Sequence, residues 1–262
     1  MTPVSIHSNF PGRSQSAIAF CDAPLAMLSM VLAASSLIFY LFPGIDLRVS
    51  GWFYDATGRF GLADSPPLRA LRASSTWIMT GVLLATLFQV ARSALRRRTA
   101  GQDARRAIWL VSCLLLGPGL LVNGLLKAHW GRPRPNATDL FGGEAPFQKV
   151  WVVSDWCDRN CSFVSGEASS AAWLVAAALL APRRIRAPAT ALAVLYAFAI
   201  SINRIAFGGH YLSDVLIAWL LCALVFAALY RLILNENAGR TSRPVSPTVV
   251  LPNPFRPGAS RQ

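Results

Sequence analysis

Charged residues are scarce in this sequence, and acidic residues are the scarcest of them. Only 14% of the 262 residues are charged, against about a quarter in soluble domains of ordinary composition. The chain has 12 acidic and 25 basic residues, and 54% of it is hydrophobic, mostly in long runs. This composition excludes an ordinary soluble domain and favours a protein that crosses a membrane several times.

Lysine, metal-type cysteine pairs and a secretion signal are also scarce or missing. Lysine occurs only at Lys127 and Lys149, so almost all positive charge is arginine. The arginines cluster in short loops between apolar runs, as topology signals and phosphate-binding residues do, and we expect no nucleic-acid partner. The cysteines include no metal-type Cys-x-x-Cys pair. The first twenty residues lack the order of a signal peptide.

Six apolar segments predict membrane-spanning helices. They cover residues 24–42, 76–91, 107–126, 168–181, 187–202 and 215–234. We therefore predict an all-α fold, a bundle of six transmembrane helices, within residues 24–234. A polar tail is expected at 1–23, and a disordered tail rich in proline, serine and arginine at 235–262. The aromatic, arginine-bearing segment 44–72 is predicted to be an interfacial helix or loop.

Arginine placement predicts the orientation of the bundle. The loop 92–106 holds six arginines, and the short loop 182–186 holds three. The positive-inside rule places both loops in the cytoplasm. The loops 127–166 and 204–213 then face outward, although they carry basic residues too. We therefore expect a multi-pass protein of a bacterial inner membrane whose outer loops have a second use for their charges.

Ionisable residues stand at the outer ends of four predicted spans. They are Lys127, Glu167, Arg204 and Asp214. An even number of crossings separates these ends, so all four lie on one membrane face, where ionisable groups are costly and usually functional. Nearby loops add Arg132, Arg134 and His210, and Ser165 and Gly166 precede a helix N-terminus, which favours anions. Together these groups predict a site for a multiply charged anion such as phosphate.

His210 and Asp214 are spaced to act as a pair. The carboxylate can hold one imidazole nitrogen and leave the other free to attack a phosphorus atom. Simpler interpretations remain: the pair could cap a helix or hold a metal, and Lys127 and Arg134 could anchor lipid headgroups. No third metal ligand is evident, so we expect neither a metal nor another cofactor.

Three motifs, "KAHWGRPRP", "SFVSGE" and "NRIAFGGHYLSD", resemble the signature of the type 2 phosphatidic acid phosphatase (PAP2) superfamily. The matching residues are Lys127, Arg134, Pro135, Ser165, Gly166, Arg204, His210 and Asp214. The resemblance implies an all-α core related to that of haloperoxidases, a lipid phosphate as substrate, a phosphohistidine intermediate and no metal. The residues expected to bind phosphate are Lys127, Arg134, Ser165, Gly166 and Arg204, with Arg132 and Asn203 as additional candidates.

The sequence departs from that signature at its second motif. Glu167 stands where the family has a histidine that protonates the leaving oxygen, and Asn203 and Val164 replace a serine and a proline. A protonated Glu167 could supply the same proton, and we predict that role. Nearby arginines lower a carboxyl pKa while burial and phosphate raise it, so the sequence leaves three alternatives open. Glu167 could orient a water, pair structurally with an arginine, or mark a weakened enzyme.

The sequence thus predicts a membrane lipid-phosphate phosphatase with its site on the periplasmic face. His210 would attack, Asp214 would fix its tautomer and Glu167 would protonate the leaving group. Phosphatidate-like lipids, polyprenyl pyrophosphate and lipid A are candidate substrates, and lipid A is favoured. A transporter for anionic lipids and a non-catalytic lipid-phosphate-binding protein are the rival interpretations. The oligomeric state is not indicated.

The loop that carries the second motif also holds Cys157 and Cys161. On the predicted topology both thiols face an oxidising compartment, which allows a local disulfide. The spacing alone does not fix the geometry that such a bond requires.

Overall fold

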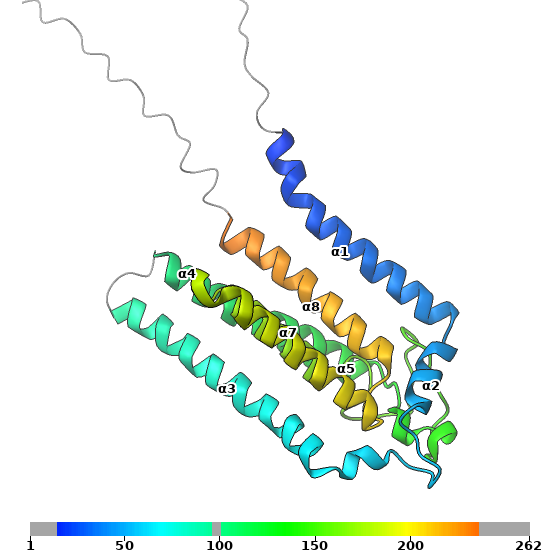
Figure 1. Cartoon of the computed structure of the whole chain (residues 1–262). Coiled ribbons are helices and arrows are strands. Elements are labelled where there is room, and N and C mark those ends of the chain that lie inside the picture. The colour runs from blue at the N-terminus through cyan, green and yellow to red at the C-terminus, as the bar shows by residue number, and fades with distance from the viewer. Residues whose placement is uncertain (1–14, 96–100, 236–262) are drawn as a thin grey trace, which may run out of the picture.

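The computed structural model describes residues 15–95 and 101–235, which form a bundle of long helices (Figure 1). The described part contains no β-strand, only an isolated bridge between Thr138 and Ala145. The predicted all-α class is therefore confirmed. The predicted tails lie outside the described residues as far as residue 14 and from residue 236 onward. Residues 15–23, which the prediction gave to the polar tail, instead form the beginning of helix α1.

All six predicted spans form helices. They are α1 (Gln15–Leu41), α3 (Pro66–Leu95), α4 (Gln102–Leu114) with its continuation, α6 (Gly166–Leu179), α7 (Arg183–Ala206) and α8 (Leu212–Ile233). The helix α4 continues through the π-helical segment η2 (Leu115–Leu126) into α5 (Lys127–His129). Five of the six stretches are long and apolar enough to cross a membrane, whereas α6, with 14 residues, is shorter.

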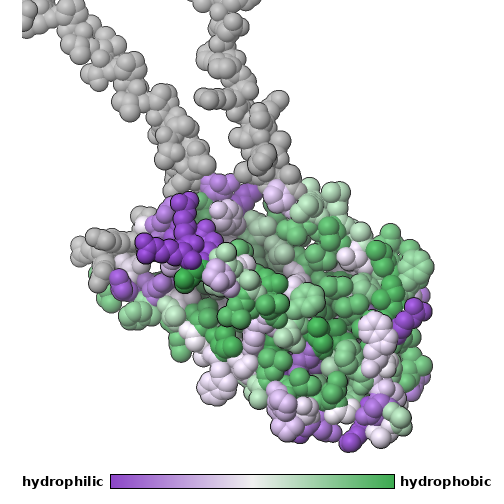
Figure 2. Space-filling model, in the orientation of Figure 1, coloured by the Kyte–Doolittle hydropathy of each residue, from purple (hydrophilic) through white to green (hydrophobic). Residues whose placement is uncertain are grey.

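The outer surface of the bundle is apolar. Among the described side chains, Trp77 is 77% exposed, Leu195 68% and Phe88 67%. Figure 2 shows hydrophobic residues over the middle of the visible face and hydrophilic residues gathered toward its ends. Such a surface would associate or aggregate in water, but it suits contact with lipid tails, because all the backbone polar groups of a helix are satisfied internally. The chain is a multi-pass membrane protein.

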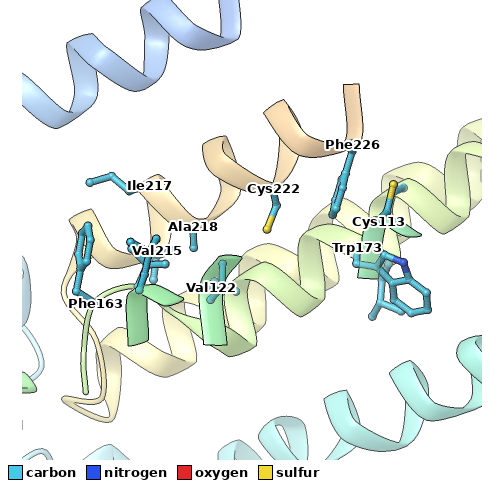
Figure 3. Close-up of a cluster of buried hydrophobic side chains, with 14 of the residues drawn as sticks. Cys113, Val122, Phe163, Trp173, Val215, Ile217, Ala218, Cys222 and Phe226 are labelled. Atoms are coloured by element: carbon cyan, nitrogen blue, oxygen red, sulfur yellow. The ribbon is translucent and has the colours of Figure 1, made fainter. Parts of the chain in front are cut away.

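The core lies where η2, α6 and α8 meet. Cys113, Val122, Trp173 and Cys222 are fully buried there (Figure 3). The indole Nε1 of Trp173 donates a hydrogen bond to the carbonyl oxygen of Leu110, 2.8 Å away, so the largest core side chain also satisfies its polar atom. This packing fixes the helices relative to one another and thereby the loops at their ends.

Two features of the segment 44–72 differ from the prediction or refine it. Its first part folds as the short helix α2 (Gly44–Gly51), which contacts α8 and α7, and a turn of 3-10 helix, η1, follows at Gly61–Asp64. Its last part is neither interfacial helix nor loop, because α3 begins at Pro66 rather than at residue 76. Proline is favoured in the first turn of a helix, where its missing N–H costs nothing. The first two turns of α3 therefore carry arginines that the prediction placed in an interfacial helix or loop.

One end of the bundle carries most of the irregular structure. Figure 1 places α2 and the long loop after α5 at this end, and the start of α4 and the end of α8 at the other. The long loop includes two single turns, η3 (Pro135–Ala137) and η4 (Asp139–Phe141). The end of α7 and the beginnings of α6 and α8 also meet here, because their residues are bonded to one another. We call it the loop end of the bundle.

Candidate active site

The beginning of α6 is anchored at the loop end by Ser165. The hydroxyl of Ser165 accepts a hydrogen bond from the backbone N–H of Ala168, 3.3 Å away, and so caps the helix. Its own N–H donates to the carbonyl oxygen of Asp214 at 3.1 Å. The next residue, Gly166, is buried, and an added Cβ would lie 2.7 Å from Oδ1 of Asn123. Glycine therefore lets α6 approach η2 closely and brings the first turn of α6 to the start of α8.

Glu167 lies in this first turn and joins three elements. Its Oε1 is 2.9 Å from Nε of Arg72 on α3, and its Oε2 is 2.6 Å from Nε of Arg204 on α7. The same Oε2 lies 3.7 Å from Nε2 of His210, which is longer than a hydrogen bond. Glu167 is thus held between two guanidinium groups beside the imidazole.

The surroundings of Glu167 favour its charged form. Burial, the largest influence, raises the pKa of Glu167, but interactions with neighbouring groups, including the guanidinium groups of Arg204 and Arg72, together outweigh it. The net pKa of Glu167 therefore lies well below the usual range of a glutamate. In this arrangement the side chain is a carboxylate, and it can carry a proton only if an anion takes over its arginine partners.

The other cations of the cluster surround Glu167. Arg204 is buried, and a Cβ at Gly209 would overlap its guanidinium group, so that glycine makes room for it. Lys127 and Arg134 are half-buried and interact electrostatically with Glu167. Arg134 also donates from Nε and Nη2 to the carbonyl oxygen of Asn160, at 3.0 and 2.7 Å. The loop end thus gathers the expected phosphate-binding side chains around one carboxylate.

His210 is fully buried and held by a backbone carbonyl. Its Nδ1 is 2.7 Å from the carbonyl oxygen of Ser162, whereas the nearest oxygen of Asp214 is 3.9 Å away. A carbonyl only accepts hydrogen bonds, so Nδ1 carries the proton and Nε2 carries the lone pair. Within the described part of the chain, Nε2 has no hydrogen-bond partner. It faces the carboxylate of Glu167.

The protonation of His210 suits a nucleophile. Burial lowers the pKa of His210 below its ordinary value, although the carboxylates of Glu167 and Asp214 act against that shift. A neutral imidazole with one nitrogen held and the other free is the form that can attack an electrophile.

Asp214 contacts the imidazole indirectly. Its Oδ2 accepts hydrogen bonds from the hydroxyl of Ser162 at 2.5 Å and from the N–H of Tyr211 at 2.9 Å. Its Oδ1 is 2.5 Å from Nη1 of Arg132. The sequence predicted that Asp214 itself would hold the histidine; the geometry instead places Ser162 between the two, with its hydroxyl on Asp214 and its carbonyl on His210.

Both additional candidates for phosphate contacts are bonded elsewhere. Arg132 is fully buried, with Nη2 2.9 Å from Oδ2 of Asp46 and Nη1 on Asp214. It therefore supports the loop instead of facing the cluster around Glu167. The amide of Asn203 donates to the carbonyl oxygen of Leu68 at 3.0 Å and holds α7 against the start of α3.

Cys157 and Cys161 form a disulfide in the structure, with their Cα atoms 5.7 Å apart. The bond closes the loop that contains Asn160, whose carbonyl oxygen accepts the hydrogen bonds from Arg134. It lies next to the cation cluster, where it restricts the loop above the site.

Three residues of this site escaped the sequence analysis. Arg72 belongs to the segment that was predicted to be interfacial, Asp46 belongs to α2, and Ser162 is the first residue of the quoted second motif but was given no role. Treating Pro66 as a helix start would have placed Arg72 at the same end as Glu167. No comparable signal marks Asp46, because its partner Arg132 is 86 residues away.

Comparisons with known proteins agree with the geometry. Residues 106–238 match the family model described as the PAP2 superfamily. A "Lipid A 4'-phosphatase" of Rhizobium leguminosarum is 38% identical over 224 residues, which cover 78% of this chain and 94% of that protein. A protein of the same name from Rhizobium etli is also 38% identical and is covered to 85%. Another, from Francisella tularensis subsp. novicida, is 33% identical over 219 residues and is covered to 96%. No solved structure matches the chain.

Proposed function

The chain belongs to the PAP2 superfamily and is a membrane lipid phosphatase, and we propose that it removes the 4'-phosphate of lipid A at the loop end of the bundle. The names of three relatives support this substrate, and each match covers 78% of the chain. The observation that carries the proposal is the buried, neutral His210, whose bare Nε2 faces the only carboxylate in the cluster of described cations.

The phosphate of the substrate binds among Lys127, Arg134 and Arg204, and the N-terminus of α6 adds the hydroxyl of Ser165 and the N–H of Gly166. Guanidinium forks suit the oxygens of a phosphate monoester, and the helix N-terminus adds partial positive charge. To reach Arg204 the phosphate must displace the carboxylate of Glu167, because that carboxylate now lies 2.6 Å from Nε of Arg204.

In the first step, Nε2 of His210 attacks phosphorus, a P–N bond forms and the P–O bond to the sugar breaks. The carbonyl of Ser162 holds the Nδ1–H and stabilises the positive charge that develops on the ring. Glu167 delivers a proton to the departing oxygen. Its pKa rises when an anionic phosphate takes its place on Arg204, which supplies the proton where it is needed.

In the second step, water cleaves the phosphohistidine. Glu167, now a carboxylate, accepts a proton from the water, oxygen bonds to phosphorus and the P–N bond breaks. One water is consumed, inorganic phosphate is released and His210 returns to its neutral form. Catalysis depends on positioning and on charge stabilisation, as is usual in phosphoryl transfer.

The site is proposed to face the periplasm. The arginines of loop 182–186 lie at the opposite end of the bundle from His210, as the positive-inside rule requires of a cytoplasmic loop. The disulfide of Cys157 and Cys161 lies at the loop end of the bundle, where the site is, and such bonds persist in oxidising compartments.

The substrate is tested with the full chain in detergent. Lipid A with both phosphates, phosphatidate and a polyprenyl pyrophosphate are offered separately, and released phosphate is measured. We expect lipid A to be the best substrate by kcat/KM, and tandem mass spectrometry to show a product that has lost the 4'-phosphate. Equal or faster hydrolysis of either other lipid, or loss of the other phosphate, would overturn the assignment.

The nucleophile is tested with His210→Ala and a matched control, His129→Ala. His129 is exposed at the end of α5. We expect His210→Ala to abolish phosphate release and trapping of a phosphorylated enzyme, and His129→Ala to retain both. Trapped phosphoenzyme in His210→Ala would contradict the mechanism.

A further inference from the structure

Asp46 is a buried carboxylate that lies far along the chain from the recognised motifs. It belongs to α2, outside the family-matched residues 106–238, and only 1% of it is exposed. A buried charge costs several kcal/mol unless its partners compensate. The partners of Asp46 must therefore compensate for its burial.

Both oxygens of Asp46 are fully engaged at the loop end. Oδ1 accepts a hydrogen bond from the N–H of Ser213 at 2.9 Å, and Oδ2 accepts one from the hydroxyl of Ser213 at 2.5 Å. The same Oδ2 is 2.9 Å from Nη2 of Arg132. Burial raises the pKa of Asp46, and the guanidinium of Arg132 acts against that rise. The N–H of Ser213 and the guanidinium of Arg132 can only donate, so Asp46 accepts from both and joins the first turn of α8 to the loop after α5.

The bonds continue from Asp46 to the nucleophile. Nη1 of Arg132 donates to Oδ1 of Asp214 at 2.5 Å, and Oδ2 of Asp214 accepts a hydrogen bond from the hydroxyl of Ser162, also at 2.5 Å. The carbonyl of Ser162 then meets Nδ1 of His210 at 2.7 Å. Every residue in this series is buried. The guanidinium of Arg132 also lies 4.3 Å from the ring centre of its neighbour Tyr211, which fixes its plane.

We propose that Asp46 is a positioning residue for the phosphatase reaction. Acting through Arg132 and Asp214, it sets where Ser162 presents its carbonyl and hence the tautomer and direction of His210. The inference rests on the proposed role of His210 as nucleophile. Buried ion pairs add little net stability compared with apolar packing of the same shape. Placement of the reacting nitrogen, by contrast, matters steeply, because a shift of about 1 Å can cost about a hundredfold in rate.

Asp46→Asn is the informative substitution. The amide has the shape of the carboxylate, but each oxygen of Asp46 faces a group that can only donate, the N–H of Ser213 or the guanidinium of Arg132. One amide N–H must therefore face another donor in either orientation. We expect kcat to fall about 10- to 100-fold. KM should stay within about twofold, because no phosphate-binding cation is touched. The control is Asp64→Asn, an exposed carboxylate between α2 and α3 that pairs with Arg59 at 3.2 Å; neither constant should change.

Ser162→Ala provides a second, milder variant in case Asp46→Asn folds poorly. It removes the hydroxyl that bonds Asp214 but leaves the carbonyl on His210. We expect a fall in kcat without a change in KM, and a double variant that loses less than the product of the two single losses, since both act through one series of bonds. Folded protein is quantified by size-exclusion chromatography, and rates are expressed per folded enzyme.

The outcomes separate this inference from the proposed function. If His210→Ala is inactive while Asp46→Asn keeps its kcat per folded enzyme, the positioning role falls and the nucleophile stands. If the losses of Asp46→Asn and Ser162→Ala multiply independently, or appear in KM, the series of bonds does not act on the nucleophile. If His210→Ala retains turnover, the proposed function itself fails.

Discussion

At the level of single residues, the proposed role of Glu167 is to give the leaving oxygen its proton. Its carboxylate is now shared between Arg72 and Arg204. Both a structural ion pair and a general acid are consistent with that contact. The two roles differ in how strongly the loss of Glu167 depends on the leaving group of the substrate. A general acid matters for a poor leaving group such as a sugar alkoxide and little for one that departs readily as an anion.

Glu167→Gln separates the two roles. For lipid A we expect kcat to fall about 10²- to 10⁴-fold, the usual contribution of a general acid. For an aryl phosphate with an acidic phenol as leaving group, the loss should be at least ten times smaller, about the size of a positioning effect. Steady-state rates with both substrates check this. Equal losses on both would assign Glu167 a structural role, and undiminished rates would remove it from the reaction.

The pH dependence should reveal the burial of His210. Nε2 can attack only while the ring is neutral, so kcat/KM rises with pH as His210 loses its proton and is level above that pKa. Burial lowers this pKa below its ordinary value of about 6.5. The acid limb should therefore lie below about pH 6.5, measured with detergent-solubilised enzyme and subsaturating substrate. An acid limb at or above that value would contradict a desolvated nucleophile.

The sequence was sufficient to predict the residues that belong to spaced motifs or stand at the ends of predicted spans. Lys127, Glu167, Arg204 and Asp214 were placed on one face by counting crossings, and the structure brings Glu167, Arg204 and His210 into contact distance. Ser162 was missed because its contacts, a hydroxyl on Asp214 and a backbone carbonyl on His210, join it to residues 52 and 48 positions away, which local spacing does not show.

At the level of helices, the start of α3 decides which arginine reaches the site. Pro66 begins that helix, so Arg69 and Arg72 stand one turn apart on it. Arg69 donates to the backbone carbonyl of Asp64, whereas Arg72 reaches Glu167. The prediction had this stretch outside the bundle, because two arginines among prolines and alanines lower its hydrophobicity. Tertiary contact across 95 residues, which local pattern cannot show, outweighs that signal.

Arg72→Ala tests whether this contact tunes the acid. Removing a positive charge beside Glu167 raises the pKa of Glu167, so the group stays protonated to higher pH. If Glu167 donates a proton, the alkaline limb of kcat should move to higher pH in Arg72→Ala, and it should stay in place in the neighbouring control Arg69→Ala. The limb is read from pH profiles at saturating lipid A. Identical alkaline limbs in both variants would show that Arg72 does not tune an acid.

Viewed as a whole molecule, the bundle separates its charges into two groups. The described cations of the site lie at the loop end, and Arg183, Arg184 and Arg186 lie at the start of α7 at the other. A transporter would need charged side chains along the middle of several spans. The middle of the bundle instead packs apolar side chains such as Val122, Trp173 and Cys222. This division supports chemistry at one membrane face and orientation signals at the other.

The orientation can be tested with the protein's own cysteines. In a Cys21→Ser background the remaining cysteines outside the disulfide, Cys113 and Cys222, are fully buried, so a membrane-impermeant maleimide applied to intact cells whose outer membrane has been permeabilised should label little of the protein. After mild reduction, Cys157, which is half-buried, should become labelled because its loop is proposed to face the periplasm. Arg184→Cys places a thiol at the other end, and it should react only once the inner membrane is opened. Labelling of that thiol in cells with an intact inner membrane, or protection of reduced Cys157 there, would reverse the assignment and with it the claim that phosphate is released outside the cytoplasm.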